Sequence, residues 1–102
     1  MVLSNRLQVV VNMVPVCAVA ADIGCDHGRL SAALLQSGAA SHVIAVDISA
    51  ASVEKTRKLA ERTGLPIDAR QGDGLLALGE GEAQTIVICG LGGTRMARLL
   101  DT

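Results

Sequence analysis

Hydrophobic residues along this chain alternate between helical spacing and short apolar runs. Near the start, apolar side chains recur every three or four positions behind a candidate N-cap at Ser4, namely Leu3, Leu7, Val10, Val11 and Val14. This spacing predicts an amphipathic helix that ends before Pro15. The stretch from Val16 to Ile23 is mostly apolar, has the length of a strand and stops at Gly24. Such a run is typical of a parallel strand that is buried on both faces.

The alternation continues to the end of the chain. Further strands are predicted at Val43 to Asp47, Ile67 to Gln71 and Thr85 to Cys89. The predicted helices are Leu30 to Gln36, one capped by Ser49 and ended by Gly64 and Pro66, a short turn at Leu75 to Leu78, and a last helix ending near Leu100. Alternating strands and helices predict an α/β fold with a parallel sheet and right-handed crossovers.

Length and composition fit one small soluble domain over residues 1–102. Half of the residues are hydrophobic, 19% are charged, and there is no Phe, Tyr or Trp, so no ring of these three types can stack on a base. The net charge of -1 gives no global footprint for nucleic acid, which leaves a local patch or a separate domain open. The three cysteines form no CxxC pair, so neither a disulfide framework nor a metal site is suggested and a cytoplasmic setting fits.

The apolar stretch near the N-terminus needs a check against targeting signals. Arg6 and the run from Val9 to Ala21 imitate a secretory signal, but Asn12 and Pro15 interrupt the run. The run is also shorter than the ~20 residues that a membrane span needs. We expect neither secretion nor a membrane span.

A glycine-rich loop follows the first predicted strand. In an open parallel sheet, ligands bind beyond the carboxyl ends of the strands, which is where Asp22 to Gly28 lies. Asp47 ends the second strand at close to the ~20 residues after Gly24 that are typical of an acid binding a ribose. Together these features predict a ligand that contains an adenosine.

The acids of the loop favour one class of adenosine ligand. Asp22 and Asp26 would repel the pyrophosphate of NAD, whereas S-adenosylmethionine has no phosphate and carries a sulfonium and an ammonium group. The alternative for Asp26 is structural, because Asp tolerates the left-handed conformation and its side chain can cap the following helix. We therefore expect Asp22, Gly24, Gly28 and Asp47 to hold the cofactor.

The third strand also ends in an acid, within Gln71 to Gly74. Asp73 can accept a hydrogen bond from an adenine amino group, or it can act as the N-cap of the turn at Leu75. Ile48 and Leu75 are the aliphatic side chains expected to flank the adenine ring.

Five segments carry a resemblance to a known family. LSNRL, ADIGCDHGRL, AVDIS, QGDGL and VICGLGG occur in this order, and the chain resembles the bacterial S-adenosylmethionine-dependent tRNA (adenine-N1)-methyltransferases that modify a D-arm adenosine. The resemblance implies that Asp22, Gly24, Asp26, Gly28 and Asp47 hold the cofactor, with Asp73 at its adenine end. It also implies a sheet of about four strands in the order 3-2-1-4.

The resemblance further implies a reaction at N1 of adenine. N1 has a lone pair, so orientation of the reactants matters more than strong base catalysis. Asp26 would stabilise the positive charge that develops on the methylated base. His27 would hydrogen-bond the base or a phosphate, or it has only a structural role.

The chain differs from the resembled family in its extent. The resemblance implies more strands and a C-terminal helical region associated with tRNA, so we expect only weak tRNA binding by this chain alone. With four strands, the strand at 85–89 would be an edge, which predicts a homodimer or higher oligomer through it. Arg95 and Arg98 on the last helix would form a basic patch or be ordinary solvated charges.

Two other functions remain open from the sequence. One is a non-catalytic cofactor-binding or assembly module that lacks the RNA-binding part. The other is an NAD-dependent oxidoreductase, which the acidic loop and the lack of a recognisable catalytic Tyr or Lys arrangement disfavour.

Overall fold

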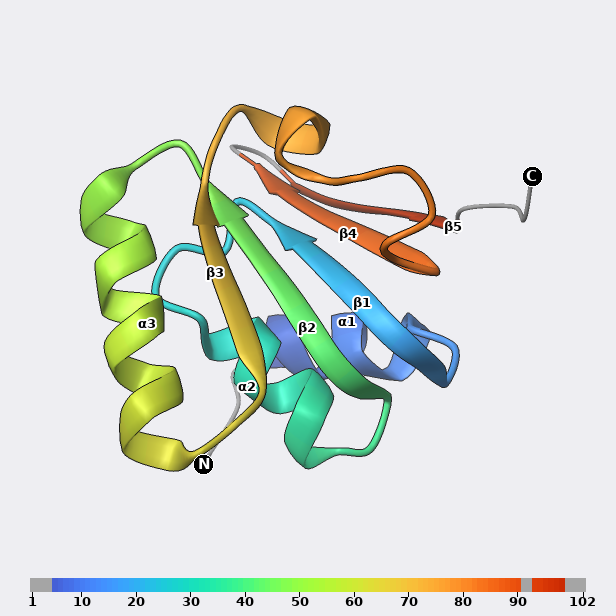
Figure 1. The fold of residues 1–102 in the computed structure, drawn as a ribbon. Helices are drawn as coiled ribbons and strands as arrows, with labels where there is room; N and C mark the ends of the chain where they lie inside the picture. The colour runs from blue at the N-terminus through green and yellow to red at the C-terminus, as the bar shows by residue number, and fades with distance from the viewer. Residues whose placement is uncertain (1–4, 91–92, 99–102) are drawn as a thin grey trace.

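The fold is a single twisted sheet with helices on one of its faces (Figure 1). The structure is a computed structural model that describes residues 5–90 and 93–98. In chain order the elements are α1 (Asn5–Met13), β1 (Cys17–Ile23), α2 (Arg29–Gln36), β2 (Ala40–Asp47), α3 (Ala50–Thr63), β3 (Ile67–Gln71), the 3₁₀ turn η1 (Gly74–Ala77), β4 (Thr85–Gly90) and β5 (Gly93–Arg98).

The sheet has the order β3-β2-β1-β4-β5. β1 pairs in parallel with both β2 and β4, so that Ile23 lies opposite Val46 on one side and Ile88 on the other. β3 pairs in parallel with β2. The predicted parallel order 3-2-1-4 is therefore confirmed. Because the four strands are parallel, their carboxyl ends and the loops that follow lie along one edge of the sheet.

The predicted last helix is wrong. Residues Gly93–Arg98 form β5, which pairs antiparallel with β4, and Gly90 lies opposite Gly93. The physical reason is that β4 would otherwise leave a row of backbone N–H and C=O groups unpaired, and a returning strand satisfies them. Arg95 and Arg98 consequently lie on a strand, and a basic patch on a helix does not exist.

The same pairing removes the reason for expecting association through residues 85–89. β4 has β1 on one side and β5 on the other, so it is not an edge strand. The edges of the sheet are β3 and β5. A homodimer or higher oligomer through 85–89 thus loses the physical argument on which it rested.

Apolar side chains cover both faces of the central strands. Helices α1 and α2 pack on one face around Ala20, Leu34, Val43 and Val87, while α3 packs along β2 and β3. The other face carries Ala21, Ile23, Ile44, Val46 and Ile86, covered in part by the chain that connects β3 to β4. Burial on both faces explains why β1 reads as a continuous apolar run rather than an alternating one.

The ends of α3 follow the predicted capping rules. The Ser49 side chain accepts a hydrogen bond from the backbone N–H of Ser52 (3.3 Å), and Gly64 adopts the left-handed conformation with φ 72°. These contacts satisfy backbone groups that a helix leaves unpaired at its ends. They fix the start of α3 directly beside the carboxyl end of β2.

Truncation of the core should be costly. Leu34 is fully buried between α2 and the sheet, so Leu34→Ala should lower the free energy of unfolding by about 2–5 kcal/mol. Leu76 is 85% exposed, and Leu76→Ala should change it by less than about 0.5 kcal/mol. Urea unfolding followed by circular dichroism measures both, and equal effects of the two variants would contradict the described core.

Candidate functional site

The loop between β1 and α2 is a tight turn built from left-handed residues. Gly24, Asp26 and Gly28 have φ values of 79°, 53° and 80°, and Asp26 is the non-glycine residue with positive φ in the described part of the chain. A Cβ atom on Gly28 would lie 3.0 Å from Cγ2 of Thr56, so glycine is needed there for space as well as conformation. The turn keeps the backbone close to the end of the sheet.

Asp47 joins the loops that follow three strands. Its Oδ2 accepts a hydrogen bond from the Asp26 N–H (3.0 Å) and its Oδ1 accepts one from the Ser49 N–H (2.9 Å). Its backbone carbonyl accepts a third from the Gly72 N–H (3.0 Å). An ionised carboxylate has about four acceptor positions, so Asp47 can hold the loops and still accept bonds from a ligand.

Asp22 is a buried carboxyl group at the end of β1. Its Oδ2 accepts a hydrogen bond from the Ser31 hydroxyl (2.7 Å), while its Oδ1 has no partner among the described residues. Burial raises the pKa of Asp22 to about 6, against the lowering effect of Ser31 and with smaller raising effects of Asp47 and Asp26. A buried acceptor without a partner is costly unless a ligand or water supplies a donor.

Asp26 and His27 are exposed at the tip of the loop. His27 Nε2 lies 3.4 Å from Oδ1 of Asp26 and 3.3 Å from Nζ of Lys55 on α3. The structural role considered for Asp26 combined a left-handed conformation with a side-chain cap on α2. Asp26 has the left-handed conformation, but the N-cap of α2 is Gly28 and no side chain caps this helix. Sequence reasoning missed Lys55, because its contact with His27 spans 28 residues of chain.

Ile48, Asp73 and Leu75 lie in the loops after β2 and β3. Ile48 and Leu75 are 71% and 52% exposed. Asp73 is the N-cap of η1, but its side chain makes no capping bond. The Gln71 amide donates to the Ile48 carbonyl (3.3 Å), which links the two loops. Asp73 is exposed, on the loop that this hydrogen bond links to Ile48.

Cys25 is unsuited to nucleophilic chemistry. The thiol is buried, with Sγ 3.4 Å from the Thr56 hydroxyl, and burial raises its pKa to about 11. A thiol with this pKa stays protonated at neutral pH, and the thiolate is the reactive species. Cys25 and Cys17 are both free thiols.

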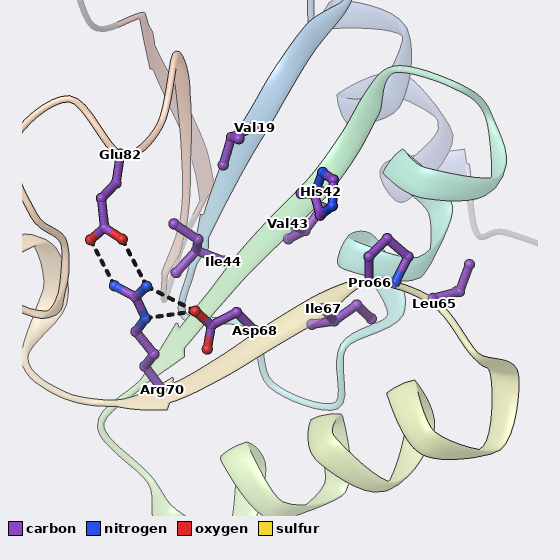
Figure 2. Close-up of a pocket in the computed structure, with 10 residues that line it drawn as sticks. All are labelled: Val19, His42, Val43, Ile44, Leu65, Pro66, Ile67, Asp68, Arg70 and Glu82. Atoms are coloured by element: carbon purple, nitrogen blue, oxygen red, sulfur yellow. Dashed lines mark hydrogen bonds and ion pairs between the residues drawn. The ribbon is translucent and has the colours of Figure 1, made fainter.

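A groove of about 460 Å³ lies on the sheet face that lacks α-helices, away from the loop between β1 and α2 (Figure 2). Its lining includes Val19, His42, Ile44 and Pro66, with Arg70, Asp68 and Glu82 at one side. All five N–H groups of Arg70 are used, by Asp68, by Glu82 and by the Ala77 carbonyl. The arginine consequently has no donor left for an anionic ligand, and the groove is a poor candidate for the site.

Two further observations restrict the chemistry of the described residues. No group of three or more His, Cys, Asp or Glu side chains in residues 5–90 and 93–98 is arranged to hold a metal ion. None of the described helices has both the length and the apolar character needed to cross a membrane.

Fold and site together define the class of protein. A parallel sheet in the order 3-2-1-4, with a glycine-and-acid loop after β1 and a second acid after β2, is a Rossmann-like arrangement, which is typical of domains that bind adenosine-containing ligands. The chain belongs to the family described as "Methyltransferase domain", whose sequence profile matches residues 3–102.

Individual relatives agree with this assignment. The chain is 41% identical over 101 residues to a tRNA (adenine(22)-N(1))-methyltransferase of Bacillus subtilis, and the match covers 97% of this chain but 42% of that protein. The crystal structure of B. subtilis TrmK, an M1A22 tRNA methyltransferase, has a TM-score of 0.83 at 41% identity, covering 89% of this chain and 40% of that one. M. capricolum TrmK in complex with S-adenosyl-homocysteine has a TM-score of 0.80 at 31% identity, covering 90% and 43%.

The buried acid should give stability a characteristic dependence on pH. The pKa of Asp22 is raised from 3.8 to about 6 in the folded state. The protonated carboxyl group therefore contributes to the free energy of unfolding below pH 3.8, and this contribution is lost as the pH rises through 6. Asp22→Asn, which cannot ionise, should therefore exceed the wild type in free energy of unfolding by up to about 3 kcal/mol at pH 7.5, and by much less at pH 4.

Urea titrations at the two pH values measure this difference. Asp73→Asn is the matched control, because Asp73 is exposed and makes no side-chain capping bond. A difference between Asp22→Asn and the wild type that does not change with pH would show that Asp22 is not buried as a titrating group.

Proposed function

We propose that this domain binds S-adenosylmethionine at the carboxyl ends of β1, β2 and β3 and acts in methylation of N1 of an adenine in tRNA. The family is that of methyltransferase domains, and a relative of known structure holds S-adenosyl-homocysteine. The named relatives are tRNA (adenine-N1)-methyltransferases. The chain spans about two fifths of their length, so the complete reaction is part of the proposal.

The observation that carries the proposal is the cluster of carboxylates at one edge of the sheet. Asp26 and Asp47 are joined by a hydrogen bond, and both raise the pKa of the buried Asp22, which places the three negative groups within electrostatic reach. Such a cluster favours a cationic ligand and disfavours a pyrophosphate. An NAD-dependent function is accordingly the weaker interpretation.

The residues present fit S-adenosylmethionine part by part. Asp22, with its unpartnered oxygen, would favour the ammonium end from beneath the loop, and Asp47 would accept bonds from the ribose hydroxyls. The turn at Gly24 and Gly28 would let the backbone approach the ligand, with Gly28 also leaving room for the Thr56 side chain on α3.

At the adenine end, Ile48 and Leu75 would flank the ring and Asp73 would accept a bond from its amino group. Binding of the ring would remove from water two aliphatic side chains that are now more than half exposed.

The chemistry required of the protein is mainly positioning. S-adenosylmethionine supplies a methyl group on a positively charged sulfur when it is bound. Asp26, exposed at the tip of the loop, would stabilise the positive charge that develops on the adenine ring. Lys55 lies against Nε2 of His27 and would donate to it, which assigns His27 a hydrogen-bonding role rather than that of a base.

Partners and location follow from charge and cysteine chemistry. The net charge of -1 gives the domain little attraction for tRNA by itself, so we expect weak tRNA binding by the isolated chain. A cytoplasmic, reducing location suits the free thiols Cys17 and Cys25.

Calorimetric titration of S-adenosyl-homocysteine tests the cofactor part. We expect micromolar binding at pH 7.5, no detectable binding of NAD, and a loss of at least about tenfold in affinity for Asp47→Asn, which keeps the size of the side chain but removes its charge. Glu61→Gln on the exposed face of α3 is the charge-matched control and should bind normally. A folded wild-type chain that does not bind would contradict the proposal.

Methyl transfer to tRNA then separates an enzyme domain from a non-catalytic module. Transfer of labelled methyl groups to N1 of adenine by the protein, lowered in Asp26→Asn by a larger factor than the cofactor affinity, is the result expected of the enzyme. If the protein binds both the cofactor and the tRNA but transfers no methyl group, the result would favour a non-catalytic module.

A further inference from the structure

The chain between β3 and β4, residues 72–84, forms a strap across the sheet face that lacks helices (Figure 1). One end is fixed by the hydrogen bond from the Gly72 N–H to the Asp47 carbonyl (3.0 Å). At the other end, the Gln84 side chain accepts bonds from the N–H groups of Ala18 (2.6 Å) and Val19 (3.3 Å). The strap carries Asp73 and Leu75, so its position determines where both residues lie.

Arg70 holds the middle of the strap. From β3, its guanidinium donates two parallel bonds to the Glu82 carboxylate, each 2.8 Å, and one to the Ala77 carbonyl (2.9 Å). Asp68, two residues away on the same strand, accepts the remaining bonds and orients the guanidinium (Figure 2). Ala77 is the last residue of η1, so Arg70 contacts directly the turn that begins after Asp73.

Glu82 also closes the strap on itself. Its carboxylate accepts a hydrogen bond from the Gly79 N–H, and its own N–H donates to the Gly79 carbonyl (3.2 Å). A Cβ atom on residue 79 would lie 2.9 Å from Oε1 of Glu82, so a larger residue there would displace the Glu82 carboxylate. One carboxylate thus joins β3, the end of η1 through Arg70, and the bend at residue 79.

The arrangement is more specific than a surface ion pair needs to be. Exposed single pairs contribute little to stability. Here a bidentate pair is combined with backbone bonds, and Arg70 is saturated, which indicates a role in geometry rather than in binding a ligand. Ala83 near the end of the strap is buried in the core, whereas Ala77 and Leu78 near Arg70 are only partly buried against the sheet.

We propose that Arg70 and Glu82 form a latch that positions Asp73 and thereby sets the preference of the site for adenine. This inference rests on the proposed cofactor site, and neither latch residue touches the cofactor. A carboxylate fixed before binding recognises the amino group without the cost of ordering the strap. Without the latch, the strap samples more positions and the contact from Asp73 is lost first.

Two ligands that differ at the amino-bearing edge of the base test this, because inosine has a carbonyl oxygen in place of the amino group and a proton on N1. S-inosylhomocysteine carries an oxygen where S-adenosylhomocysteine carries the amino group. We expect the wild type to prefer the adenine ligand by about tenfold or more, the value of a hydrogen bond to a charged acceptor. Glu82→Ala should reduce that preference to within about threefold while binding the inosine ligand as the wild type does.

Controls separate positioning from general damage. Glu54→Ala removes the same charge from an exposed ion pair with Arg57 on α3 and should keep the full preference. Glu82→Gln retains an acceptor for Arg70 and Gly79, so this variant should keep a large part of the preference for the adenine ligand. An equal loss of affinity for both ligands in Glu82→Ala would overturn the latch, since that is the result of mere structural damage.

Hydrogen exchange without ligand tests the latch independently of the cofactor. The amides of Leu76 and Leu78 are bonded to the carbonyls of Asp73 and Leu75. In Glu82→Ala both should exchange at least about tenfold faster, with no change in β1 and β2. Unchanged exchange at these two amides would overturn the proposal. If the wild type failed to bind S-adenosylhomocysteine, the cofactor proposal would fail, and exchange alone would decide whether the latch orders the strap.

Discussion

The main constraint on this structure is that three negatively charged carboxylates lie together at the carboxyl edge of the sheet. Asp22, Asp26 and Asp47 come from two neighbouring strand ends, and the most buried of them, Asp22, keeps one oxygen without a partner. Ionisation of Asp22 therefore destabilises the unliganded fold at neutral pH. Proteins commonly leave polar groups unsatisfied at functional sites. The unsatisfied group here is a buried carboxylate oxygen, which a cationic ligand would neutralise and hydrogen-bond. This is the physical link between the fold and the proposed methyl donor.

The two sides of the site are held by different devices. On one side, Asp47 binds the backbone of three loops, so the position of the β1 loop follows directly from the parallel pairing of β1, β2 and β3. On the other side, the strap has no extended pairing with the sheet, and the Arg70 side chain supplies the fixed points instead. The Asp47 contacts follow from the pairing of the strands, whereas the Arg70 contacts can be removed by one substitution without altering the core.

Local patterns predicted the parts of the molecule that local rules determine. The apolar run before Gly24, the cap at Ser49 and the glycine at the end of α3 predicted the alternation of strands and helices. The strand order 3-2-1-4 was predicted from the family resemblance, and the acids at three strand ends are brought to one edge. β5 was missed because pairing with β4, a tertiary requirement, outweighs the helical spacing of residues 93–98. The Arg70–Glu82 and His27–Lys55 contacts were missed because they join residues 12 and 28 positions apart, which no periodicity reveals.

The most direct test of this account is the pKa of Asp22, measured from the carboxyl carbon resonance by NMR with and without saturating S-adenosylhomocysteine. The account predicts a value of about 6 in the unliganded protein. It predicts a fall of at least about one unit in the complex, because the ammonium group of the ligand favours the ionised form. A pKa that stays near 6 or rises when the ligand is bound would contradict the claim that this buried acid is kept for a cationic ligand.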